Sequence, residues 1–291
     1  MSKSPRKVTQ IIEPKYVIEG ADVLLRRSFG PSRANPFDPF LLFDHFAFNN
    51  PIEGPIVGFP THPHRGIETV TYMLEGNVRH RDSLGNTGVI GPGAVQWMTS
   101  GRGILHEELP KRGPEGRVNG FQLWVNLPAA LKMSPPRYQE FSAGEIVEIA
   151  QPNLKTRLVA GNFAGQAGLT TDIAAQPLYM DVFLEPGSEF HHEIPLGHTT
   201  IAYVFEGEGI FGVNDMGDGE FVEAVNMVVL GDGDSLRVQT GASQHVRFML
   251  IAGHPFHEPV VPYGPFVMNT EAEIRQVFED IRNGTFAKEP A

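Results

Sequence analysis

The sequence predicts an all-β protein with two tandem barrels or sandwiches and one short helix at the C-terminus. Short runs of alternating apolar and polar residues are separated by closely spaced turns that contain glycine and proline. Much of this pattern recurs later in the chain, which indicates an internal duplication. Only the last segment has its apolar residues at helical spacing.

The first half contains the expected strands in close succession. Branched and aromatic residues dominate Thr69–Glu75, and such side chains suit a half-buried pleated strand. Gly76 and Asn77 end this run. We expect strands over residues 8–12, 23–30, 40–46, 69–76, 79–82, 94–99 and 121–126, and a loop rich in proline and glycine over 49–60.

The second half repeats this frame. Residues 200–207 resemble residues 69–76, and the glycines that end the two runs are 131 positions apart. The segment 131–140 contains Ser134-Pro135-Pro136 and is interpreted as a linker. The sequence therefore predicts two domains, residues 1–134 and residues 135–291.

The C-terminal segment has the pattern of a capped helix. Thr270 and Glu273 have the spacing of a capping box, in which side chain and backbone at the start of a helix bond each other. Apolar residues follow at helical spacing, and Gly284 suits the C-terminal cap. We expect this helix to lie on a barrel and to carry no chemistry.

Composition excludes several classes of function. The 291-residue chain is 41% hydrophobic, which is typical of a globular protein. Its net charge is -11 and it has no sustained basic block, which argues against direct nucleic-acid binding. It has no cysteine, so it cannot form disulfides or thiolate ligands, and this fits a reducing, cytoplasmic compartment. No signal-peptide pattern opens it and no apolar run is long enough to span a membrane, so we expect no membrane partner.

Two pairs of residues have the spacing of metal ligands. His62 and His64 form one pair, and His106 and Glu108 form the other. On a strand, side chains two positions apart point to the same face, so each pair can reach one point. If the two strands are antiparallel neighbours, three imidazoles and one carboxylate can converge on a single ion. Such a cysteine-free set suits Fe(II), Mn(II), Ni(II), Cu(II) or catalytic Zn(II). The alternative is a polar barrel mouth with hydrogen-bonded histidines.

Other polar residues lie near these pairs. Glu68 is an even number of positions from both first histidines, so on an unbroken strand it could be a ligand or could orient an imidazole. Gln122 could line the cavity or be a buried amide bonded to the backbone. Arg65 and Arg102 could attract an anion or form surface salt bridges. The remaining histidines without ligand spacing are interpreted as ordinary polar or surface residues: His45, His80, His198, His254 and His257.

The second half retains the frame but not the ligands. At the 131-residue offset, Glu193 replaces His62 and Pro195 replaces His64. His191 and His192 are adjacent, so on a strand they would point to opposite faces. We therefore expect a metal only in the first half.

Several long blocks resemble one known family. HPHRGIETV (62–70), QWMTSGRGILH (96–106) and QLWVNL (122–127) are similar to the pirins of the cupin superfamily. FLLFD (40–44) and FVMNT (266–270) extend the resemblance over nearly the whole chain. It implies two tandem cupin barrels of the jelly-roll type. It also implies an iron ion in the N-terminal barrel only, held by His62, His64, His106 and Glu108, with no ligand role for Glu68.

The resemblance implies two alternative functions. Family members resemble quercetin 2,3-dioxygenases, so one expectation is an Fe(II)-dependent dioxygenase that opens a flavonol with release of carbon monoxide. Its partners would be the flavonol and O₂, and Glu108 would be the catalytic base that takes the hydroxyl proton. The other expectation is a redox-sensing iron protein, a transcriptional cofactor that acts through a protein partner.

Overall fold

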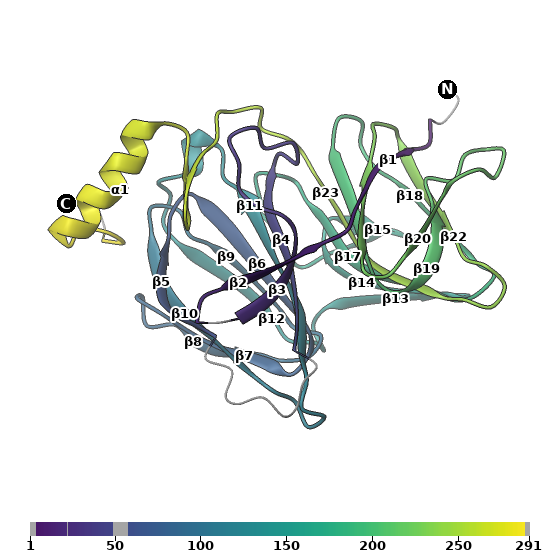
Figure 1. Cartoon of the computed structure of the whole chain (residues 1–291), viewed down its shortest axis with the longest axis horizontal. Coiled ribbons are helices and arrows are strands. Elements are labelled where there is room, and N and C mark those ends of the chain that lie inside the picture. The colour runs from purple at the N-terminus through teal and green to yellow at the C-terminus, as the bar shows by residue number, and fades with distance from the viewer. Residues whose placement is uncertain (1–3, 22, 49–57, 289–291) are drawn as a thin grey trace. The chain divides into compact units, whose positions relative to one another are not determined.

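The computed structural model describes residues 4–21, 23–48 and 58–288, and it confirms the all-β prediction (Figure 1). Most of the loop expected over 49–60 lies outside the described residues. No helix in the described part of the chain is long and apolar enough to cross a membrane. The elements are β1(Val8–Ile12), β2(Lys15–Glu19), β3(Val23–Phe29), β4(Phe40–Phe48), β5(Phe59–His64), β6(Ile67–Glu75), β7(Asn77–Asp82), β8(Thr87–Ile90), β9(Val95–Thr99), β10(Ile104–Lys111), β11(Val118–Asn126), η1(Ala129–Leu131), β12(Arg137–Phe141), β13(Val147–Gln151), β14(Leu154–Ala160), β15(Asn162–Phe163), β16(Gln166–Ala167), β17(Leu178–Leu184), β18(Glu189–Glu193), β19(Thr199–Phe211), β20(Glu220–Glu223), β21(Asn226–Leu230), β22(Ser235–Gln239), β23(Val246–Gly253), β24(Val261–Tyr263), β25(Phe266–Met268) and α1(Glu271–Asn283).

The chain forms two compact units, which differ in extent from the two expected domains. The first barrel comprises Lys15–Glu145 and Phe256–Ala291, and the second barrel comprises Met1–Pro14 and Ile146–Pro255. Residues 137–141, expected within a linker, instead form β12, which pairs with β9 at the edge of the first barrel. A single boundary at residue 134 therefore does not describe the division of the chain.

The first barrel contains a seven-stranded and a four-stranded antiparallel sheet. The larger sheet has the order β12-β9-β6-β11-β4-β3-β2, and the smaller has the order β5-β10-β7-β8. The burial along β10 alternates, so Ile104, His106 and Glu108 are buried while the residues between them are more exposed. The first ligand pair lies on β5 and the second on β10, which are hydrogen-bonded neighbours in the smaller sheet.

The C-terminal segment belongs to the first barrel. Phe266, the first residue of β25, forms an isolated bridge with Arg65, which directly follows the first ligand pair in the sequence. The buried Nζ of Lys132 donates to the carbonyl oxygens of Gly66 and Val267 at 2.9 and 2.8 Å, which joins the same two segments. Helix α1 begins with the expected capping box at Thr270, and Gly284 ends it in the left-handed conformation. Sequence spacing thus gave the helix correctly but not the barrel to which it belongs.

The second barrel contains a ten-stranded antiparallel sheet with an apolar interior. In it, β18 pairs with β22, as β5 pairs with β10 in the first barrel. The residues of these two strands that enter the core are Phe190, Leu236 and Val238, and all three are fully buried. The half-buried His192 on β18 packs its ring against Phe163 and Phe190. In the described residues, these strands of the second barrel therefore hold apolar packing and no histidine cluster.

Candidate metal centre

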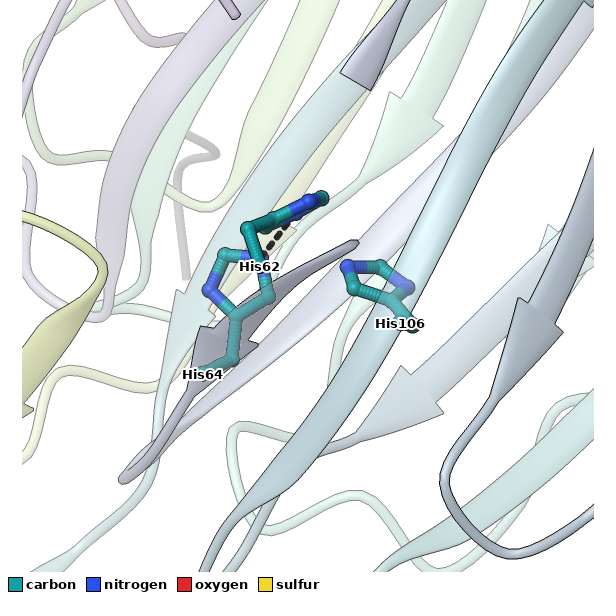
Figure 2. A group of neighbouring side chains, drawn as sticks. All are labelled: His62, His64 and His106. Atoms are coloured by element: carbon teal, nitrogen blue, oxygen red, sulfur yellow. Dashed lines mark hydrogen bonds between the residues drawn. The ribbon is translucent and has the colours of Figure 1, made fainter. Parts of the chain in front are cut away.

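Three histidines converge in the first barrel, as their spacing predicted. His106 on β10 lies directly opposite His62 on β5, and Ile104 lies opposite His64. One ring nitrogen from each of His62, His64 and His106 lies within 4.8 Å of the others. Figure 2 shows the three rings grouped between the two strands, with a dashed line from His62 to His64.

Backbone carbonyl groups fix the orientation of two of these rings. Nδ1 of His62 is 2.9 Å from the carbonyl oxygen of Pro60, and Nδ1 of His64 is 3.3 Å from that of Pro265. A carbonyl oxygen only accepts hydrogen bonds, so each Nδ1 carries a proton, and in the neutral ring Nε2 then presents a lone pair. The two Nε2 atoms are 3.1 Å apart. Two facing lone pairs repel each other, and a cation between the rings would remove that repulsion.

His106 completes the group as a buried imidazole. Neither of its ring nitrogens has a hydrogen-bond partner among the described residues. Burial, followed by the neighbouring histidines, lowers the pKa of His106 well below its usual value and lowers that of His64 to about 3. Both rings are therefore neutral near pH 7 and can offer lone pairs. The unsatisfied nitrogens and the neutral donor set fit a first-row transition metal ion.

Glu108 lies beside this group but does not belong to the set of ligand atoms that all lie within 4.8 Å of one another. Its Oε2 is 3.9 Å from Nε2 of His106, and its Oε1 accepts a hydrogen bond from Oγ1 of Thr71 at 3.3 Å. Burial raises the pKa of Glu108. Whether this carboxylate is a fourth ligand stays a prediction, because the three imidazoles alone form the close cluster in the described residues.

A cavity of about 520 Å³ opens beside the cluster. His62, His64 and Glu108 lie in its wall, together with Gln122 and the indole of Trp124. The expectation that Gln122 lines the cavity is confirmed. The volume lies within the usual range of pockets that enclose a small organic ligand. The first barrel therefore has room for a small organic molecule beside His62 and His64.

Glu68 has neither of the roles that its spacing suggested. Gly66 has a φ of 81°, which interrupts the strand between the first histidine pair and β6. The carboxylate of Glu68 instead accepts hydrogen bonds from Nε1 of Trp97 at 3.1 Å and Oγ1 of Thr99 at 2.7 Å. The face assignment was wrong because it assumed an unbroken strand.

We expect Glu68 to make the stability of the protein depend on pH. Burial raises its pKa from 4.5 to about 7. The folded state therefore binds this proton more tightly than the unfolded state. The resulting stability is fully present below pH 4.5 and is lost as the pH rises through 7. Between pH 5 and pH 8, Glu68 should lower the unfolding free energy of the wild-type protein by up to about 3 kcal/mol. Glu68→Gln has no group to titrate at this position and should not show that decrease. Urea unfolding of both chelator-treated proteins at the two pH values measures this, and equal pH slopes would contradict it.

Arg65 forms a salt bridge, but in a buried position. Its NH1 donates to Oδ2 of Asp280 in α1 at 2.7 Å, and its Nε donates to the carbonyl oxygen of Arg102. Its guanidinium also lies 4.7 Å from the ring centre of Phe286. Arg65 therefore joins the first histidine motif to the C-terminal helix.

Two further histidines are buried rather than at the surface. Nε2 of His45 is 2.8 Å from Oδ1 of Asn119, and Nε2 of His80 is 2.9 Å from Oε2 of Glu140. Each has a side-chain partner of its own, which agrees with a polar role outside the cluster.

The sequence interpretation did not identify Thr71 or the carbonyl group of Pro265. Thr71 is buried on β6, between Thr69 and Met73. The alternation of that strand would have placed all three on one face. Pro265 lies 201 positions from His64, and no spacing rule relates residues so far apart.

Comparisons with known proteins agree with the fold. The family model described as Pirin matches residues 22–125, and that described as Pirin C-terminal cupin domain matches residues 179–287. A pirin-like protein of Caulobacter vibrioides is 44% identical over 283 residues, covering 97% of this chain and 99% of the relative. Pirin of Homo sapiens is 41% identical over 283 residues, covering 96% of this chain and 93% of the relative.

A solved structure has the same architecture. Quercetin 2,3-dioxygenase from Acinetobacter baumannii is 33% identical and superposes with a TM-score of 0.86, covering 97% of this chain and 99% of that chain. Both family models, and two relatives above 40% identity over more than nine-tenths of this chain, are pirins or pirin-like proteins. The chain is therefore a member of the pirin family.

Proposed function

We propose that this chain is an Fe(II)-dependent dioxygenase that opens a flavonol such as quercetin. One observation supports the proposal most: one ring nitrogen from each of three histidines lies within 4.8 Å of the others, beside a cavity of about 520 Å³. The similarity to a quercetin 2,3-dioxygenase supports the choice of substrate class. In this reaction O₂ adds at C2 of the flavonol, the central ring opens, and one ring carbon leaves as carbon monoxide.

His62, His64, His106 and Glu108 would hold the ion. Three imidazoles and one carboxylate leave open positions on an ion that prefers six ligands. When bound, such an ion supplies Lewis acidity and the one-electron chemistry that O₂ requires. The carbonyl groups of Pro60 and Pro265 keep the two β5 imidazoles in the tautomer that the ion needs.

Glu108 is the proposed base for the flavonol 3-hydroxyl. Its carboxylate lies in the cavity wall, where a substrate hydroxyl beside the imidazoles can reach it. Oγ1 of Thr71 lies 3.3 Å from Oε1 of Glu108 and 3.0 Å from Oε1 of Gln122. Its single proton can hold either oxygen in place. Removal of the hydroxyl proton would leave an electron-rich enolate, the form of the substrate that reacts with O₂.

The apolar wall of the cavity suits the aromatic rings of a flavonol. Trp124 and Phe59 line it, and Leu42 lies opposite Trp124 on the neighbouring strand. Packing flat rings against these side chains excludes water from the reacting centre.

Turnover of quercetin by Fe(II)-reconstituted protein in air tests this proposal. We expect loss of flavonol absorbance together with release of carbon monoxide, and neither in chelator-treated protein. If iron-loaded protein produces neither, the dioxygenase proposal fails. A partner that binds in only one oxidation state of the iron would then favour the regulatory alternative.

A further inference from the structure

A row of polar side chains crosses the cavity wall of the first barrel. Four strands contribute one residue each in direct register: Arg27 lies opposite Asp44, Asp44 opposite Gln122, and Gln122 opposite Thr71. Directly opposed residues point to the same face of a sheet. All four line the cavity. The row therefore extends from the proposed catalytic end, at Thr71, to a distal end, at Arg27.

The distal end is a bidentate ion pair. Nε and NH2 of Arg27 donate to the two carboxylate oxygens of Asp44, each at 2.8 Å. NH1 donates to Oε1 of Glu19 at 2.8 Å. The side chain of Asp44 is 4% exposed and that of Arg27 is 21% exposed, so the pair is fixed in the wall and remains accessible from the cavity.

Apolar residues flank this polar row on the same sheet. Leu25 precedes Arg27 by two positions, and Leu42 and Phe46 lie two positions on either side of Asp44. Neighbouring strands are about 4.8 Å apart, so Asp44 lies about 10 Å across the sheet from Thr71. That separation suits two polar groups at opposite ends of a flat aromatic molecule.

The row retains hydrogen-bonding capacity for a ligand. The amide nitrogen of Gln122 has no hydrogen-bond partner in the described part of the chain. Arg27 uses three of its five N–H groups in the ion pairs, and each oxygen of Asp44 has further lone pairs. The two carboxylates of Glu19 and Asp44 face the single guanidinium of Arg27, so this end of the row has a net negative charge and would repel a carboxylate ligand. A neutral hydroxyl group, which can both donate and accept, fits this end.

We propose that Gln122 and the Arg27–Asp44 pair recognise neutral ring hydroxyl groups on the substrate, at the end away from the reacting hydroxyl. This makes them residues that determine specificity, and it rests on the proposed function for the ligand class. A hydrogen bond to a charged group commonly changes affinity by about ten- to a hundredfold. A flavonol without distal hydroxyl groups should bind more weakly by that factor.

Anaerobic calorimetry with Fe(II)-loaded protein tests this independently of turnover. We expect quercetin to bind about ten- to a hundredfold more tightly than 3-hydroxyflavone, which carries only the reacting hydroxyl. In the double variant Arg27→Met/Asp44→Leu, this ratio should fall towards one. Apolar replacement of both partners avoids leaving one charge buried alone.

The second barrel offers a matched control. There Arg247 donates to both oxygens of Asp181 at 3.0 and 2.7 Å, and Glu206 lies 3.9 Å from the same guanidinium. Neither residue of this pair lines the cavity. Arg247→Met/Asp181→Leu should therefore retain the wild-type ratio.

Two results would overturn the inference: a wild-type ratio near one, or an unchanged ratio in the cavity double variant. If that variant does not fold, Gln122→Leu, which retains the ion pair, is measured instead and should lower the ratio. Aerobic turnover separates the two proposals. A clear binding preference without quercetin cleavage would defeat the dioxygenase function and leave the recognition intact. Quercetin cleavage with an affinity ratio that is unaltered in the cavity double variant would support the dioxygenase function and defeat the recognition proposal.

Discussion

His64→Ala is expected to abolish metal binding, lowering the metal content from about one ion per chain to near zero after dialysis. Its Nε2 is one of the nitrogens that meet within 4.8 Å, and removal leaves two imidazoles. Loss of a residue that merely orients a ligand commonly weakens metal binding by about 10- to 100-fold, so loss of a ligand should cost more. Elemental analysis of protein purified without chelators and reconstituted with Fe(II) measures the result.

His45→Ala is the control for this variant. His45 is also buried in the first barrel, but its Nε2 bonds to Asn119 and it is not part of the cluster. It should retain the full metal content even if its stability falls. If His64→Ala retained the same full metal content as His45→Ala, the cluster would not be the site that holds the ion.

Glu108→Gln should lower kcat for quercetin by about 10²- to 10⁴-fold, the usual contribution of a positioned base. The amide has the same shape and can still accept a hydrogen bond from Thr71, but it cannot take the hydroxyl proton. The metal content of the variant must be measured as well, because the same carboxylate is also the proposed fourth ligand. A rate loss larger than the loss of metal would identify the role in proton transfer.

Glu107→Gln provides the matched comparison on the same strand. The side chain of Glu107 is less buried and lies 3.2 Å from Nε of Arg81. Changing it removes one negative charge next to the site without altering the cavity wall. Wild-type kcat in Glu108→Gln with full metal occupancy would exclude that carboxylate as the base.

The local parts of the site could be predicted from sequence because they depend on strand periodicity. Residues two apart on a strand share a face whatever the rest of the fold does. This rule placed His62 and His64 together, and the register between β5 and β10 brought His106 opposite His62. The duplicated strand pattern likewise indicated two barrels, and the capping residues indicated α1.

The parts that failed depend on backbone breaks and on contacts between distant segments. Gly66 interrupts the strand, so Glu68 does not share a face with His62 and His64 although it is an even number of positions from them. Pro265 orients His64 from the far end of the sequence, and Lys132 joins the same C-terminal segment to Gly66. Nothing in the amino-acid composition indicates that Phe256–Ala291, which follow the second barrel in the sequence, belong to the first barrel.

A crystal structure of the Fe(II)-reconstituted protein, with anomalous data collected at the iron edge, would locate the ion. We expect one strong peak in the first barrel, bound by Nε2 of His62, His64 and His106, with the carboxylate of Glu108 as the fourth ligand. A peak elsewhere, or no peak between β5 and β10 in protein shown to contain iron, would contradict this expectation.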